Sequence, residues 1–202
     1  MPSGSPGIDP HFDYLHGILT NVPGYATQAK LDRFEAAEAA EAIVRLTADP
    51  TNGNFDSAHL KEIHRRIFQT IYPWAGQFRQ VNLNRSASNP FAVVRFLEKS
   101  LDETFAKLAS EKHLQGLDIV SFANRAAYYL GELNSIHPFR EGNGRTQREL
   151  IRGLGAEAGH RINWIHVTRE EMYKASIESH NLGRNAALAL LIGKAIERSR
   201  RI

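Results

Sequence analysis

The chain has 202 residues, 42% of them hydrophobic, with a formal net charge of +3 and no cysteine. This length suits one domain with a substantial core, and the missing cysteines exclude disulfides and cysteine-ligated zinc. No apolar run approaches the roughly 20 residues that a membrane-spanning helix needs, and the Pro/Gly-rich start lacks a secretion-signal core. The charge is too small to indicate nucleic-acid binding. We therefore expect a cytoplasmic protein with no membrane contact and no direct nucleic-acid partner.

The expected elements follow from hydrophobic spacing and from capping residues. Residues 1–24 are expected to form an irregular arm that ends in Pro23-Gly24, and residues 25–202 one folded domain. Helices are expected over about 27–48, from an Asp56 cap to the Tyr72-Pro73 break, over about 96–112 and 117–136, from Asn143 or Gly144 to about 159, from the Thr168 capping box, and over about 185–198. The fold class is therefore all-α, a compact helical bundle.

One segment, from Gln77 to Val94, lacks helix signals. Its first part alternates apolar residues with polar ones, at Phe78, Val81 and Leu83, and a turn-like run follows at 85–89. Alternation with period two is typical of a half-buried strand. We predict a short β-hairpin here, with a structureless surface loop as the alternative.

Chemistry-bearing residues gather in twelve consecutive positions, His137-Pro138-Phe139-Arg140-Glu141-Gly142-Asn143-Gly144-Arg145-Thr146-Gln147-Arg148. Glycines on both sides of Asn143, at a turn that opens a helix, favour close approach of backbone N–H groups to an anion. Arg145 and Arg148 lie three residues apart and so share one helix face, where guanidinium groups suit phosphates.

Two more residues of this stretch suit chemistry on a phosphate. Glu141 sits beside the anion-binding turn, where a carboxylate usually holds Mg²⁺ together with phosphate and water. His137 can take a proton from an attacking hydroxyl near neutral pH. Each residue also has a structural reading, as a turn or a capped helix end, but their combination favours a polyphosphate site. His59 and His64, five residues apart on one helix, are assigned packing or surface roles.

The twelve residues resemble the Fic-family signature His-x-Phe-x-(Asp/Glu)-Gly-Asn-Gly-Arg-x-x-Arg at every fixed position. The run 72–79, Tyr-Pro-Trp-Ala-Gly-Gln-Phe-Arg, resembles the segment that leads into the family's flap hairpin, and Trp164 and the run 169–172 resemble further family positions. The resemblance covers residues from about 27 to 198. It implies the Fic fold, in which the hairpin is a flap beside the active-site loop.

The resemblance implies transfer of AMP from ATP to a Tyr, Thr or Ser hydroxyl of a target protein. His137 would be the general base, Phe139 a buried anchor of the loop, and Glu141 the ligand of Mg²⁺. The flap would pair with a target segment by strand addition and place its hydroxyl in line with the α-phosphate. Its docking residues would be Val81, Asn82, Leu83 and Phe91, with Phe91 as an apolar clamp.

For the nucleotide, the resemblance assigns the α- and β-phosphates to Gly142, Asn143 and Gly144. Arg145 would contact the β-phosphate and Arg148 the γ-phosphate. In the related death-on-curing branch, which transfers a phosphate, a lysine stands at the position of Gly144. The glycine favours nucleotidyl transfer over phosphotransfer, while transfer of UMP or phosphocholine stays open.

Fic proteins are commonly silenced by a helix that carries Ser/Thr-x-x-x-Glu-Gly/Asn, whose glutamate pairs with the second arginine of the signature. The one glutamate here that precedes Gly or Asn is Glu141, which belongs to the signature itself. This pattern resembles bacterial toxins restrained by a separate small antitoxin, whose targets include the B subunits of DNA gyrase and topoisomerase IV. The alternatives are an effector domain that modifies small GTPases of a host, which the absence of a trailing transport domain disfavours, and a silent peptide-binding module.

Overall fold

The computed structural model describes residues 8–86 and 89–197. The helices in this part of the chain are α1 (Gln28–Ala48), α2 (Ser57–Phe68), α3 (Val94–Ser110), α4 (Ile119–Ile136), α5 (Asn143–Glu157), α6 (Arg169–Leu182) and α7 (Ala186–Ala195), with short 3-10 turns at Lys112–Leu114 and Trp164–His166. The strands are β1 (Phe12–Asp13), β2 (Ile18–Leu19), β3 (Asn84–Ser86) and β4 (Asn89–Pro90). The predicted mostly helical fold is confirmed.

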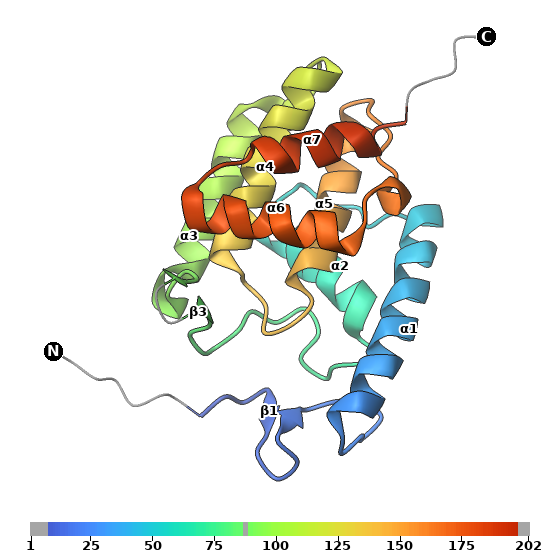
Figure 1. The fold of residues 1–202 in the computed structure, drawn as a ribbon, viewed down its shortest axis with the longest axis vertical. Helices are drawn as coiled ribbons and strands as arrows, with labels where there is room; N and C mark the ends of the chain where they lie inside the picture. The colour runs from blue at the N-terminus through green and yellow to red at the C-terminus, as the bar shows by residue number, and fades with distance from the viewer. Residues whose placement is uncertain (1–7, 87–88, 198–202) are drawn as a thin grey trace, which may run out of the picture.

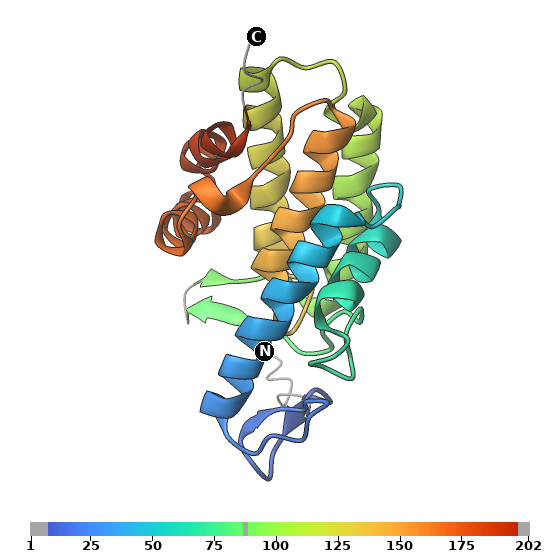
Figure 2. The ribbon, with the colours of Figure 1, turned by 90° about the vertical axis from the view of Figure 1, so that its right-hand side faces the viewer.

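Helix α4 lies at the centre of the bundle. It packs against α3, α5, α6 and α7, while α2 packs against α1, α3 and α5. In Figure 1, α6 and α7 cross in front of α4 and α5, and Figure 2 shows them on one side of the bundle. The buried face of α4 includes Phe122, Ala126, Ala127, Leu130 and Leu133. Its apolar surface is therefore covered on several sides, which fixes the position of its C-terminal end.

The two capping residues predicted from the sequence, Asp56 and Thr168, start α2 and α6 as expected. The Asp56 side chain accepts a hydrogen bond from the His59 backbone N–H, 2.8 Å away, at the start of α2. Thr168 and Glu171 form the expected reciprocal capping box at the start of α6. Each cap satisfies backbone N–H groups that the first helical turn leaves without partners.

The last helix is shorter than predicted. Helix α7 ends at Ala195, whereas the sequence suggested about residue 198. Ile196 is extended and pairs with Ile162 in an isolated antiparallel bridge, and the Glu197 backbone N–H donates to the Arg161 carbonyl at 2.8 Å. This pairing across the fold overrides helix propensity. The basic run at residues 198–201 lies outside the described residues.

The hairpin predicted between Gln77 and Val94 is present as the antiparallel pair β3–β4. Asn84 lies opposite Pro90, and the strands are only three and two residues long. Figure 2 shows this hairpin on the same side of the bundle as α6. The Ala92 N–H donates to the Ser135 carbonyl at 3.1 Å, so the hairpin is attached to the last turn of α4.

The N-terminal segment, expected to be irregular, contains the strand pair β1–β2. It is also tied to the signature loop, because the buried Asp9 carboxylate pairs with Arg140 at 2.6 Å. The His11 ring stacks on Trp74 with centroids 4.9 Å apart. Two-residue strands are too short for hydrophobic alternation to reveal them.

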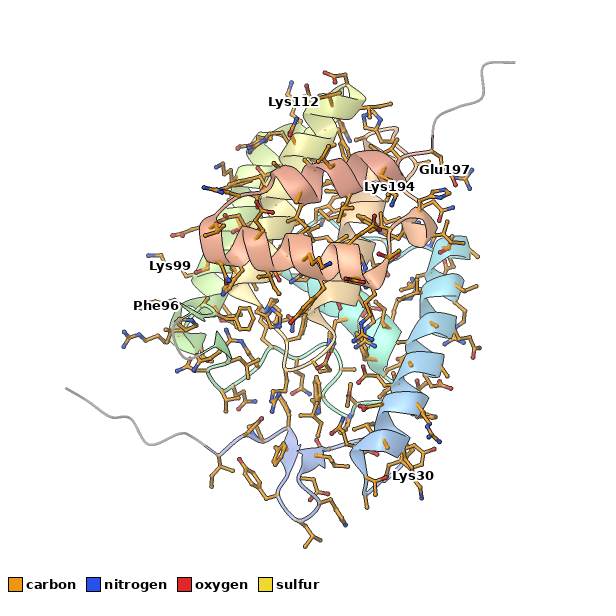
Figure 3. The ribbon with its side chains drawn as sticks, in the orientation of Figure 1. Lys30, Phe96, Lys99, Lys112, Lys194 and Glu197 are labelled. Carbon is orange, nitrogen blue, oxygen red and sulfur yellow. The ribbon has the colours of Figure 1, made fainter. Side chains whose placement is uncertain are left out.

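No helix in residues 8–86 or 89–197 is long and apolar enough to cross a membrane. In Figure 3 the labelled Lys30, Lys99, Lys112 and Lys194 project from different sides of the molecule. These four side chains therefore form no single basic face.

Candidate active site

The signature occupies the loop between α4 and α5 and the first turns of α5, at the end of the bundle that faces the N-terminal segment (Figure 1). His137 ends α4 in a left-handed conformation with φ of 51°, and Pro138 follows. The half-buried His137 ring stacks on Phe91 with centroids 3.9 Å apart and an interplanar angle of 13°. Its Nδ1 lies 3.4 Å from the Asn134 carbonyl oxygen. The imidazole is thus held between the end of α4 and the hairpin.

Asn143 closes the loop with its side chain. Its Oδ1 accepts from the Phe139 N–H and its Nδ2 donates to the Phe139 carbonyl, both at 2.8 Å. The Phe139 side chain is buried and stacks on the His64 ring with centroids 3.9 Å apart. These two bonds orient the Asn143 side chain into the loop, so the backbone N–H is the group of this residue that we expect to meet an anion.

His64 supports the loop from beneath, within the core. Its Nε2 donates to the Glu141 carbonyl at 3.1 Å, and its Nδ1 accepts from the Gly76 N–H at 2.8 Å. Burial lowers the pKa of His64 to about 3, so the ring is neutral at all ordinary pH values. The packing role assigned from sequence is correct, and the ring also links two loops.

This neutral histidine gives an expected pH dependence of stability. The folded pKa of about 3 lies below the unfolded value of 6.5, so between them the unfolded chain holds a proton that the folded chain lacks. The free energy of unfolding therefore falls as the pH is lowered. The contribution of His64 to this fall is about 2 kcal/mol between pH 7 and 5. Burial lowers the pKa values of His11 and His59 too, and these shifts act in the same direction. Urea titrations at several pH values measure the slope.

The matched variant is His64→Gln, whose amide keeps one donor and one acceptor but does not titrate. Its stability is expected to be flatter than that of the parent between pH 7 and 5. Parallel curves for the two proteins would contradict the assignment of this slope to His64.

The two glycines of the signature serve different purposes. Gly142 precedes α5 with φ of +83°, and a Cβ there would lie 2.4 Å from the Phe68 ring. Gly144 has no left-handed backbone, and a Cβ there would meet only the Arg148 Nη1, at 3.4 Å. Gly142 is therefore required by conformation and by close packing, whereas Gly144 keeps the cavity side of the helix open. Of the two, only Gly142 has a positive φ.

The two signature arginines are in different electrostatic states. Arg145 pairs with Glu35 at 2.5 Å and approaches Glu141 at 3.3 Å, and its guanidinium lies 4.7 Å from the Phe68 ring centroid. Tyr72 donates to the other oxygen of Glu35. Burial of the tyrosine, with this hydrogen bond, raises its pKa.

Arg148 has no carboxylate partner within the described ranges 8–86 and 89–197. Burial lowers its pKa to about 10, and the nearby cations Arg145 and Arg169 add to this effect. A partly desolvated cation without a counterion is an unfavourable arrangement for the protein alone. The arrangement becomes favourable when an anion binds.

One cavity of about 950 Å³ brings most of the predicted site residues together. His137, Glu141, Gly142, Gly144, Arg145 and Arg148 all line it. Helix α1 forms a second wall of the cavity. A third comes from α4, α6 and the turn before α6, and includes Leu130, Trp164, Met172, Tyr173 and Ser176. The Trp164 indole N–H donates to the Arg148 carbonyl at 3.0 Å, which fixes this wall to α5. The volume and the mixed lining suit a nucleotide.

The four predicted flap residues, all within the described part of the chain, are not among those that line the cavity. Val81 and Leu83 are half-buried, and the Leu83 carbonyl accepts from the Phe91 N–H at 3.2 Å. The exposed Asn82 caps α3 by accepting from the Val94 N–H at 2.9 Å. Phe91 is 8% exposed, and its ring contacts the rings of both His137 and His180. The aromatic ring predicted to clamp a target thus contacts the predicted base directly.

A family profile described as "Fic/DOC family" matches residues 54–154, which include the loop, the glycines and both arginines. The chain belongs to the Fic/DOC family. It is 45% identical over 172 residues to protein adenylyltransferase VbhT of Bartonella schoenbuchensis, covering 85% of this chain and 36% of VbhT. It is 34% identical to "Probable protein adenylyltransferase y4lH" of Sinorhizobium fredii, covering 89% of this chain and 91% of that protein.

A solved structure supports the fold. The BepC protein of Bartonella tribocorum, a VirB-translocated effector with bound AMPPNP, superposes with a TM-score of 0.86 at 26% identity, covering 94% of this chain and 97% of the chain in that crystal structure. The helical bundle with its hairpin is therefore that of a Fic domain. The chain spans only about a third of VbhT, 36% of its length.

Proposed function

We propose that this chain transfers AMP from ATP to a hydroxyl side chain of a target protein. The observation that carries the proposal is the single cavity in which His137, the open start of α5 and two arginines converge. The names of the relatives, protein adenylyltransferases, and the ATP analogue bound to BepC support it. Groups placed in this way can hold a triphosphate and direct a nucleophile at its α-phosphorus.

In this proposal the phosphates bind at the N-terminus of α5. Gly142 offers no capping side chain, so the first-turn N–H groups face an incoming anion together with the helix dipole. Arg145 contacts the β-phosphate and Arg148 the γ-phosphate. The adenine lies toward the apolar wall formed by Leu130, Trp164 and Met172.

Glu141 suits a magnesium ion that arrives with the nucleotide. Its carboxylate is 47% exposed, with Oε1 accepting from the Gly142 N–H at 2.7 Å. No group of three or more potential metal ligands occurs among the residues that the structure describes. One carboxylate with phosphates and water is a usual Mg²⁺ environment, and the ion would neutralise phosphate charge.

The proposed reaction uses His137 as the base. A neutral imidazole with its hydrogen on Nδ1, toward the Asn134 carbonyl, has its basic lone pair on Nε2. The target hydroxyl loses its proton to this nitrogen, and its oxygen attacks the α-phosphorus of ATP. The bond from the α-phosphorus to the bridging oxygen breaks, and pyrophosphate leaves.

Labelled ATP tests the reaction type. The protein is incubated with candidate targets and ATP labelled at either the α- or the γ-phosphate. We expect label on the target from α-labelled ATP alone. Transfer of the γ-label alone would establish phosphotransfer instead, and no label from either substrate, with nucleotide binding intact, would favour a peptide-binding module. Labelled UTP, tested in parallel, covers UMP transfer.

We further propose that the enzyme is a toxin restrained by a separate antitoxin. The unpaired state of Arg148 in the described structure and the missing inhibitory motif support restraint from outside. A synthetic helix with the sequence pattern Ser-x-x-x-Glu-Gly should abolish transfer by placing its glutamate on Arg148. A peptide with alanine for that glutamate is the control, and equal effects of both peptides would contradict this restraint.

The target candidates are the B subunits of DNA gyrase and topoisomerase IV, with a host-directed role as the second candidate. The similarity to BepC, an effector translocated by a VirB system, favours the second candidate. The α-label assay decides between them when DNA gyrase, topoisomerase IV and a panel of small GTPases compete in one reaction. Preferential labelling of the GTPases would replace the toxin proposal.

The Glu35–Arg145 pair gives a prediction about nucleotide affinity. Glu35 places a carboxylate against the cation that is to hold the β-phosphate, 2.5 Å away. Glu35→Gln removes this negative charge, so we expect ADP to bind about fivefold more tightly by calorimetry. Glu38→Gln, one turn along α1 and bonded to Thr70 at 3.0 Å, is the matched control. Weaker ADP binding by Glu35→Gln would show that the pair orients Arg145 instead.

A further inference from the structure

Arg79 is a buried arginine without an acidic partner within the described residues, and nothing in the proposed chemistry uses it. It is 2% exposed, and burial lowers its pKa to about 10. Burying a guanidinium is unfavourable unless its hydrogens are bonded. An apolar residue would fill the same space with a smaller desolvation penalty. The groups that Arg79 bonds therefore indicate what the buried guanidinium does in this fold.

The Arg79 side chain donates to four backbone carbonyls on three separate segments. Nε bonds the His137 carbonyl at 2.8 Å, and Nη2 bonds the Ile136 carbonyl at 3.2 Å, both at the end of α4. Nη1 bonds the Val81 carbonyl at 2.8 Å, and Nη2 also bonds the Ala92 carbonyl. Val81 and Ala92 lie on the two chain segments that flank the hairpin. The guanidinium therefore joins the hairpin base to the predicted catalytic turn.

The bond to His137 also bears on backbone conformation. His137 has φ of 51°, in the left-handed region that residues other than glycine rarely adopt. The Arg79 Nε–H fixes the carbonyl of this residue, and the Arg79 backbone N–H donates to the next carbonyl, that of Pro138, at 2.9 Å. Arg79 thus supports the turn on which the imidazole is mounted.

Aromatic packing extends the same linkage. Phe91 directly precedes Ala92, whose carbonyl Arg79 holds, and the Phe91 ring stacks on His137 at 3.9 Å. Displacement of the hairpin base would therefore displace both the ring against the imidazole and the strand that is to receive the target.

We propose that Arg79 is a positioning residue that fixes the flap hairpin and the His137 turn in one relative geometry, so that a target bound by the flap presents its hydroxyl to the base. This inference rests on the proposed AMP transfer. It assigns Arg79 to the protein substrate and the base, and not to the nucleotide, because its bonds reach none of the phosphate-binding residues.

The test compares Arg79→Met, Arg79→Lys and the control Arg125→Met. Arg125 pairs with Glu111 at 2.5 Å near the other end of α4, so its loss removes a half-buried ion pair without touching the hairpin. For Arg79→Met we expect kcat/KM for the protein target to fall about 100-fold, the order expected for misplacement by about 1 Å. The Kd for ADP should change less than twofold. Lysine, whose three N–H donors all lie on one nitrogen, cannot reach all four carbonyls and should recover only part of the loss.

Hydrogen exchange supplies a readout that needs no catalysis. The amides of Phe91, Ala92 and His137 should exchange at least tenfold faster in Arg79→Met than in Arg125→Met, while core amides of α4 stay equally protected in both. If Arg79→Met does not fold, the same comparison uses Arg79→Lys. Unchanged exchange at these three amides would overturn the proposal, as would equal losses of target transfer and ADP affinity. If the parent protein transfers no AMP, the proposed function fails, and exchange alone decides the role of Arg79.

Discussion

Replacement of His137 by alanine is expected to lower AMP transfer by about 10²–10⁴-fold, the usual contribution of a positioned general base. The physical reason is that no other imidazole lines the cavity of about 950 Å³ within the described part of the chain. Transfer of the α-label to a protein target measures the loss. The Kd for ADP should stay within threefold, since the proposed phosphate contacts lie at the start of α5 and not at His137.

The matched control is His180→Ala. His180 also contacts the Phe91 ring, with centroids 4.9 Å apart, so its removal disturbs the same aromatic stack without removing the proposed base. We expect this variant to retain at least a tenth of the parent activity. Equal losses in the two variants would indicate that the stack, and not the imidazole at position 137, determines the rate.

Replacement of Arg148 by methionine is expected to stabilise the protein without nucleotide and to weaken nucleotide binding. The folded protein holds this cation partly desolvated, with its pKa lowered to about 10 by burial. Its removal should raise the free energy of unfolding by about 1–3 kcal/mol in the absence of nucleotide, because a buried charge without a partner is unfavourable. The same change should raise the KM for ATP about 100-fold through loss of a charged phosphate contact.

Urea unfolding with and without ADP measures both effects, since a bound ligand adds stability according to its affinity. Arg169→Met is the control, because Arg169 is an exposed cation on the wall of the same cavity, and its removal should leave the stability nearly unchanged. Lower stability of Arg148→Met than of the parent would show that the guanidinium has favourable partners in the protein itself.

Signals confined to a few neighbouring residues were sufficient to predict much of this protein. The caps at Asp56 and Thr168, the helix end at His137 and the twelve-residue signature depend on local backbone chemistry. A hairpin was correctly predicted between Gln77 and Val94, but the alternating residues all precede β3, and the run 85–89 that was expected to be a turn includes strand residues. The start of each helix was predicted better than the end of α7, where a pairing between Ile162 and Ile196 decides the conformation.

The supporting residues of the site could not be predicted, because their partners are far away in the chain. Glu35 lies 110 positions from Arg145, His64 lies 77 positions from Glu141, and Arg79 lies 58 positions from His137. Each is an ordinary helix or loop residue in its own surroundings. Arg79 does lie in the run 72–79, which resembles the family segment before the flap. That resemblance marked the residue as part of the family pattern but did not predict what it bonds.

The positions of the two tryptophans allow intrinsic fluorescence to report on the cavity. The chain has two of them, and Trp74 is 3% exposed beneath the loop, stacked on Tyr72 with centroids 4.4 Å apart. Trp164 instead forms part of the cavity wall. In a Trp74→Phe variant, the remaining indole would report the arrival of a nucleotide as a change of fluorescence. Binding could then be followed on the millisecond scale without a labelled ligand or a protein target.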